Sequence, residues 1–169
     1  MKHRCPIALL LAIVANAAVA QNTGPPAQSD TRDAAAAFIA TQHYIVGRIG
    51  TDCLSAVGRE ESPSEFEQKW KDDNASYLDA ATKYEAARLD EIYDPAEREN
   101  AEASYKTTVQ GPGELAVKQL LSDRPKDEAC KFALEMVDTG SMHIEEYART
   151  AKLPIMKNLI ELVEWAKTN

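Results

Sequence analysis

The sequence contains few of the residues and motifs on which most catalytic and cofactor-binding sites depend. It has three histidines and three cysteines, and it lacks a C-x-x-C pair, a nucleophile elbow, a P-loop and a dinucleotide fingerprint. It also lacks any sustained alternation of apolar and polar residues, which is the pattern of a half-buried strand. We therefore expect a protein without a β-sheet, without a cofactor and without enzymatic activity.

Long hydrophobic runs are absent except for one near the start. Residues 7–14 form an unbroken apolar stretch, preceded by two basic residues and followed by Ala-Val-Ala at 18–20. This order is typical of a secretory signal peptide, and the run is shorter than the roughly 20 residues of a membrane span. We predict a signal peptide over residues 1–20, cleavage near Ala20, a flexible leader over 21–29, no membrane anchor, and a periplasmic or secreted location.

Basic residues are scarce. The net charge of the chain is −8, and it becomes −10 when Lys2 and Arg4 leave with the predicted signal peptide. Residues 60–102 contain 14 acidic and 5 basic residues, so most of the acid is concentrated in one stretch. This balance argues against binding to nucleic acid or to anionic membranes and is compatible with a basic exported protein as the partner. No pattern in the sequence indicates an oligomeric state.

Only Cys53 and Cys130 remain after removal of the predicted signal peptide. Two such thiols usually pair in an oxidising compartment. Closing a loop of about 78 residues stabilises a fold by roughly 4.5 kcal/mol in the chain-entropy model. We predict this disulfide between two antiparallel helices, an arrangement that places Gly50 opposite Ala133 and lets the backbones approach.

Apolar residues recur at helical spacing along the rest of the chain. The predicted fold class is an all-α, single-domain bundle of about six helices with one disulfide, over residues 30–169. The G-P-G sequence at 111–113 is expected to end a helix, and the apolar last segment is expected in the centre of the bundle. The predicted helices cover 30–57, 62–92, 94–109, 114–121, 125–139 and 144–151, and Pro154 either kinks the last of these or starts a new helix, with the final segment at 155–165.

The two histidines that follow the predicted signal peptide suggest one metal hypothesis. The antiparallel register places His43 near His143, and Glu145 and Glu146 are adjacent to the second histidine. Two imidazoles and a carboxylate suit zinc or copper. We predict no metal site, and a metal-binding protein through these histidines stays an open alternative.

Aromatic residues at helical spacing share the acidic stretch. Phe66, Trp70, Tyr77 and Tyr84 fall on one stripe of the helix predicted over 62–92. In one interpretation the stripe is the buried face and the acids are the solvated face. In the other, acidic and aromatic side chains together form a surface for a partner. The contact residues in the second case are Glu65, Trp70, Asp72, Asp73, Tyr77 and Asp79.

The predicted export, the size and the localised acid together favour non-catalytic binding. The interpretation we favour is an inhibitor or immunity-type protein that engages a basic protein. This interpretation is an analogy with other proteins of that type. The other alternative is a periplasmic stress or holdase-type helical protein, which needs an exposed apolar groove to hold its clients.

Overall fold

A computed structural model describes residues 28–169, so the predicted signal peptide and most of the predicted leader lie outside the described part. This part contains seven α-helices, one short 3₁₀ helix and no strand. The prediction of an all-α single domain is confirmed. The elements are α1 (Asp30–Cys53), η1 (Ser55–Val57), α2 (Pro63–Asp73), α3 (Ala75–Asp90), α4 (Pro95–Ser122), α5 (Lys126–Asp138), α6 (Ile144–Thr150) and α7 (Met156–Thr168).

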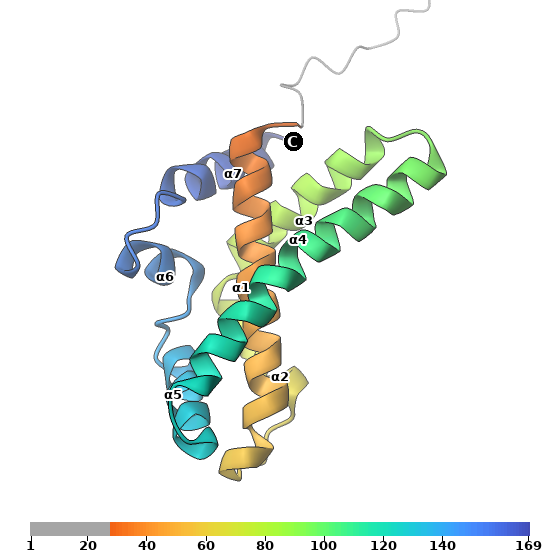
Figure 1. Cartoon of the computed structure of the whole chain (residues 1–169). Coiled ribbons are helices and arrows are strands. Elements are labelled where there is room, and N and C mark those ends of the chain that lie inside the picture. Colours follow the sequence, from red (N-terminus) through yellow and green to blue (C-terminus); the bar gives the residue numbers. More distant parts are fainter. Residues whose placement is uncertain (1–27) are drawn as a thin grey trace, which may run out of the picture.

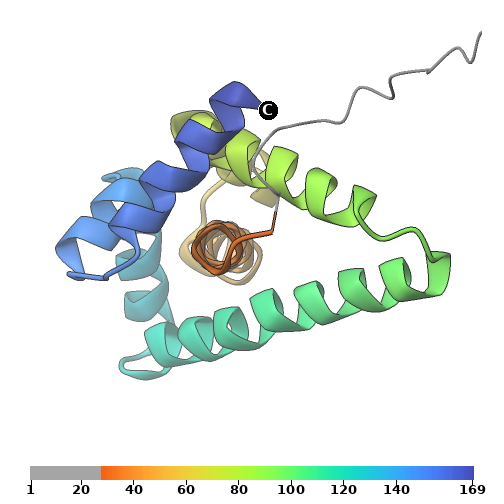
Figure 2. The same cartoon turned by 90° about the horizontal axis from the view of Figure 1, so that it is seen from above.

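Helix α1 is the centre of the molecule. Figure 2 looks along α1 and shows the other helices arranged around it, and α1 packs against α2, α3, α4, α5 and α7. Its residues Ile39, Val46 and Ile49 are completely buried. The prediction that the last helix occupies the centre is wrong, because α7 packs through one face only and leaves Ile160 57% exposed.

The first turn of α1 is held by contacts from both α3 and α7. The Ser29 side chain caps the helix by accepting from the Arg32 backbone. The Arg32 guanidinium is buried beside the rings of Tyr84 and Trp165, and it forms an ion pair with Glu161 at 3.2 Å. These contacts fix the direction in which α1 enters the bundle.

Asn74 divides the helix expected over 62–92 into α2 and α3. Its backbone leaves the helical region at φ −115° and ψ 16°. Its buried amide donates to the Trp70 carbonyl at 2.7 Å and accepts from the Ile144 backbone at 2.8 Å. The helix breaks here because this hydrogen bond joins Asn74 to the start of α6. No pattern within residues 62–92 indicates that contact.

Helix α4 runs without interruption through the G-P-G sequence at 111–113, so the predicted helix end there is wrong. A Cβ on Gly113 would lie 2.5 Å from Cδ1 of Tyr44, which means that the glycine permits a close crossing with α1. Pro112 is exposed, and its ring costs one intrahelical hydrogen bond. Packing of α4 along α1 outweighs that cost.

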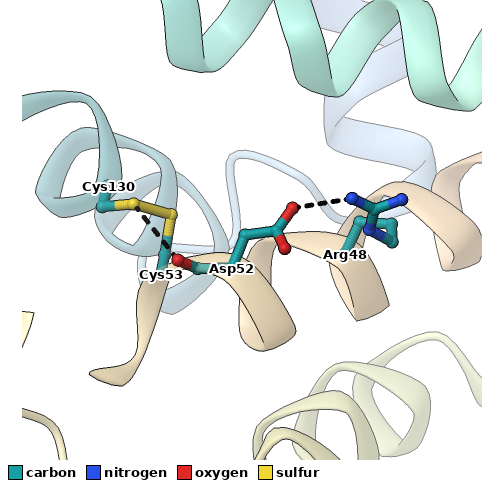
Figure 3. Close-up of a disulfide and its surroundings, with 4 residues drawn as sticks. All are labelled: Arg48, Asp52, Cys53 and Cys130. Atoms are coloured by element: carbon teal, nitrogen blue, oxygen red, sulfur yellow. Dashed lines mark hydrogen bonds and ion pairs between the residues drawn. A yellow bond between two sulfur atoms is a disulfide. The ribbon is translucent and has the colours of Figure 1, made fainter. Parts of the chain in front are cut away.

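The predicted disulfide joins Cys53 at the end of α1 to Cys130 of α5, with the two Cα atoms 5.0 Å apart. Figure 3 shows the bridge and, on the preceding turn of α1, the ion pair of Arg48 with Asp52. Figure 1 shows α5 rising beside the lower end of α1 in the opposite direction. The expected role of Gly50 is wrong: the backbone of this glycine faces Phe66 and Pro63 of α2 instead of α5.

Candidate functional site

The four acidic residues predicted to contact a partner lie on the surface. Glu65 closes the capping box at the start of α2, and its pKa is lowered by the backbone hydrogen bond from Ser62. Asp72 accepts a hydrogen bond from a side chain one turn earlier in the helix. Asp73 lies 3.4 Å from the imidazole of the second histidine, whereas Asp79 is exposed on α3. Three of these four carboxylates therefore already contact groups within the protein.

The two aromatic residues of the predicted contact surface point inward. Trp70 is 1% exposed, and its indole donates to the Met142 carbonyl at 2.9 Å. Tyr77 is half-buried, and its hydroxyl donates to Glu145 at 3.1 Å. Assignment of Trp70 to an exposed contact surface is wrong, because its side chain belongs to the core. The aromatic stripe is the inner face of α2 and α3.

The two histidines have different carboxylate partners. The His43 Nε2 atom lies 2.6 Å from Glu67, and its ring stacks on Trp70 with the centroids 5.9 Å apart. His143 lies beside Asp73 instead. Within residues 28–169, no group of three or more His, Cys, Asp or Glu side chains is placed to hold a metal ion. The metal hypothesis thus finds no ligand set in that part of the chain.

Two adjoining hollows follow the seam where α3 and α4 diverge from α1. The lower hollow has a volume of about 550 Å³ and is lined by His43, Tyr44 and Glu67 among others. The upper hollow, nearer the start of α1, has a volume of about 460 Å³ and is lined by Tyr84, Leu89 and other residues of all three helices. Both volumes are in the range of small-molecule pockets.

Glu85 of α3 and Tyr105 of α4 line both hollows and are hydrogen-bonded to each other. Burial raises the pKa of the Glu85 carboxyl above its ordinary value, and the hydrogen bond from Tyr105 opposes that shift. Burial likewise raises the pKa of the Tyr105 phenol, and the bond to Glu85 adds to the shift. A carboxylate whose pKa is perturbed in a cleft is a candidate functional group.

The charged side chains at the outer edges of the hollows are paired. At the lower edge, Arg48 bonds Asp52 and Glu114. At the upper edge, Arg88 lies 3.4 Å from Asp33 and 2.9 Å from Glu91. The Asp33 carboxylate also accepts from the Tyr84 hydroxyl, whose pKa burial raises to about 12. At each end of the seam one arginine therefore pairs with two carboxylates, which leaves the cluster with a net negative charge.

The turn between α3 and α4 projects away from the body as an arm. Figures 1 and 2 show the two helices meeting at the point of this arm, far from α1. We define the arm end as residues 90–102, which contain six acidic residues and one basic residue, a net charge of −5. The basic residue, Arg98, donates to the Ile92 carbonyl. Tyr93, at the turn itself, is 93% exposed.

The acidic stretch at 60–102 contains both the arm end and α2, and the sequence does not show which of the two is the more exposed. Glu85 was also missed, because nothing local separates one glutamate on a helix from its acidic neighbours. Tyr105 could have been selected as a candidate, because it is one of the few large side chains in an otherwise apolar-poor part of α4. Its hydrogen bond to Glu85 depends on the packing of α3 beside α4, which the sequence does not show.

None of the helices of residues 28–169 combines the length and the apolar character required to cross a membrane. Comparisons with protein-family models, curated proteins and solved structures found no match to this chain. Its class is therefore defined by its own architecture: an all-α domain with one disulfide between the first and fifth helices.

Proposed function

We propose that this protein is an exported, non-catalytic binding protein of the inhibitor or immunity type, and that it engages a basic protein through the arm end. The observation that carries the proposal is the combination of a net charge of −5 over residues 90–102 with Tyr93, which is 93% exposed at the turn. Tyrosine is enriched at the energetic centres of protein interfaces, and a charged rim steers a partner of opposite sign toward it.

The shape of the arm supports the same proposal. The arm end projects beyond the body, so a concave partner surface can receive it without meeting the other helices. Asp94 caps α4 by accepting from two backbone N–H groups, and Arg98 bonds the turn. A turn held in this way loses little conformational entropy when it binds.

A non-catalytic role is supported by the surroundings of the most reactive side chain near the hollows. His43 contacts Glu67 and the face of Trp70, and no hydroxyl or thiol of residues 28–169 hydrogen-bonds to its ring. Nucleophilic catalysis needs a nucleophile within hydrogen-bond reach of its base, and this imidazole has none.

The holdase alternative has less support. The exposed large apolar side chains of residues 28–169 come from three different helices and from the turn between α3 and α4. A holdase requires contiguous apolar surface. These side chains are Tyr93, Leu115, Phe132 and Ile160.

The test first identifies the partner with a photo-crosslinking amino acid at position 93, and then measures association with that purified partner. Changing Asp90 and Glu99 to lysine should slow association about tenfold or more at low salt, because electrostatic steering is lost. Tyr93→Ala should speed dissociation. The matched control is Asp72→Lys with Asp73→Lys, which makes the same charge change on α2. Slow association in the α2 variant alone, or association insensitive to both charge and salt, would contradict the proposal.

A further inference from the structure

The upper hollow holds two carboxylates that no cation neutralises. Glu85 projects from α3 and Glu102 from the facing α4, and neither forms an ion pair with any residue of 28–169. The guanidinium of Arg88 borders the same hollow, but its charge is already engaged by Asp33 and Glu91. The negative charge inside the hollow is therefore uncompensated.

Burial raises the free energy of the ionised Glu85 carboxylate. Within the described part of the chain, the only hydrogen bond to its carboxylate comes from the neutral phenol of Tyr105. A carboxylate removed from water loses hydration that one neutral donor replaces only in part. A cation placed against it would recover that free energy.

Much of the remaining wall of the upper hollow is aromatic or aliphatic, and it includes Tyr84, Tyr105, Leu89, Ile92 and Ala36. The paired Arg88 and Asp33 and the hydroxyl residues Ser104 and Thr108 make up the polar part. Aromatic faces attract ammonium groups, and aliphatic walls favour an apolar body. A volume of about 460 Å³ accommodates a small molecule.

We propose that the upper hollow binds a small organic cation, an ammonium group carried on an apolar body, with the ammonium against Glu85 and Glu102 and the body against Tyr84, Leu89 and Ile92. A divalent metal ion is a poor alternative, because residues 28–169 provide no group of three or more metal-binding side chains. An anion is disfavoured by the two carboxylates. Two of these residues, Ile92 and Glu102, also belong to the arm end, but the hollow faces α1 through Asp33, Ala36 and Ala37 and its proposed ligand is independent of the basic partner.

The experiment titrates the protein with hexylamine, hexan-1-ol and hexanoate, followed by two-dimensional NMR of backbone amides. Hexylamine should bind in the upper hollow about tenfold or more tightly than the neutral alcohol, the difference expected for one charge-assisted contact. Hexanoate should not bind. Nα-acetyl-lysine amide tests whether the hollow takes a lysine side chain instead, and it should bind more weakly than hexylamine.

Two variants with the same charge change locate the site. Glu85→Gln should lower hexylamine affinity about tenfold, whereas Glu99→Gln, on the exposed outside of the arm, should leave it unchanged. Tyr105→Phe should keep binding, because it removes only the neutral donor. Equal affinity for amine and alcohol, equal losses in both Gln variants, or no saturable shift with hexylamine at millimolar concentration would overturn the proposal. Tighter binding of the lysine amide than of hexylamine would assign the hollow to a protein side chain instead.

Discussion

The body around α1 and the arm end use the same types of residue in opposite ways. In the body, Trp70 and Tyr84 are almost completely buried and hydrogen-bonded. In the arm, Tyr93 is 93% exposed, and Glu99 has no side-chain partner among residues 28–169. An aromatic residue of the acidic stretch is therefore a core residue or a surface residue according to its distance from α1. Composition alone does not separate the two.

The largest effect should come from truncating a buried aromatic residue of the body. Trp70→Ala removes a buried side chain that stacks on His43 of α1 and bonds the Met142 carbonyl just before α6, and we expect a loss of about 3–5 kcal/mol in the free energy of unfolding. Tyr93→Ala should change the same quantity by less than about 0.5 kcal/mol, because its side chain is solvated. Chemical denaturation followed by circular dichroism measures both. Similar losses in the two variants would remove the distinction between body and arm.

The disulfide should have the next largest effect. Changing Cys53 and Cys130 together to alanine should lower the free energy of unfolding by about 2–4 kcal/mol, since the unfolded chain is no longer constrained by a closed loop. Adding a reductant to the unchanged protein before denaturation provides the control and should shift the denaturation midpoint in the same direction. An unaltered midpoint in both experiments would show that the bridge does not stabilise the body.

Two glycines of α4 provide a test of the packing at the place where the arm joins the body. Gly113→Ala forces a methyl group toward Tyr44, and we expect a loss of about 1–3 kcal/mol in the free energy of unfolding. At Gly111 a Cβ meets no other part of the fold within 4 Å, and the gain in helix propensity from alanine is opposed by crowding against the following Pro112, so Gly111→Ala should change the free energy of unfolding by less than about 1 kcal/mol. Thermal denaturation of the two variants tests the crossing of α4 over α1. Equal effects in the two variants would mean that the crossing is looser than described.

The smallest expected effect concerns Glu85. Because burial raises its pKa in the folded protein, the folded state holds its proton more tightly than the unfolded state between the ordinary and the raised pKa. Stability contributed by this group is present at low pH and is lost as the pH rises through that window. Glu85→Gln should therefore raise the melting temperature slightly at neutral pH and leave it unchanged below the ordinary carboxyl pKa. A gain of the same size at both pH values would contradict the cause assigned to the shift.

The helix starts and the disulfide could be predicted because each depends on local chemistry or on the simple pairing of two thiols. The helix predicted from residue 62 begins there because the S-P-S-E sequence at 62–65 forms a capping box, and Cys53 pairs with Cys130. Asn74 could not be recognised as a break, because the Ile144 backbone that donates to its amide oxygen lies 70 residues further along the chain. The continuity of α4 through Pro112 was hidden for the same reason, since contact with Tyr44 holds the next residue.

By itself the sequence determined the all-α class, the acidic stretch, the helix caps and the disulfide, because helical periodicity, charge and capping chemistry act over a few residues. Only the tertiary structure decided that α1 is central, that Trp70 is a core residue while Tyr93 is exposed, and that Glu85 and Tyr105 meet between diverging helices. Burial is a property of neighbours distant in the chain, and it determines which of many acids carries an uncompensated charge in a hollow.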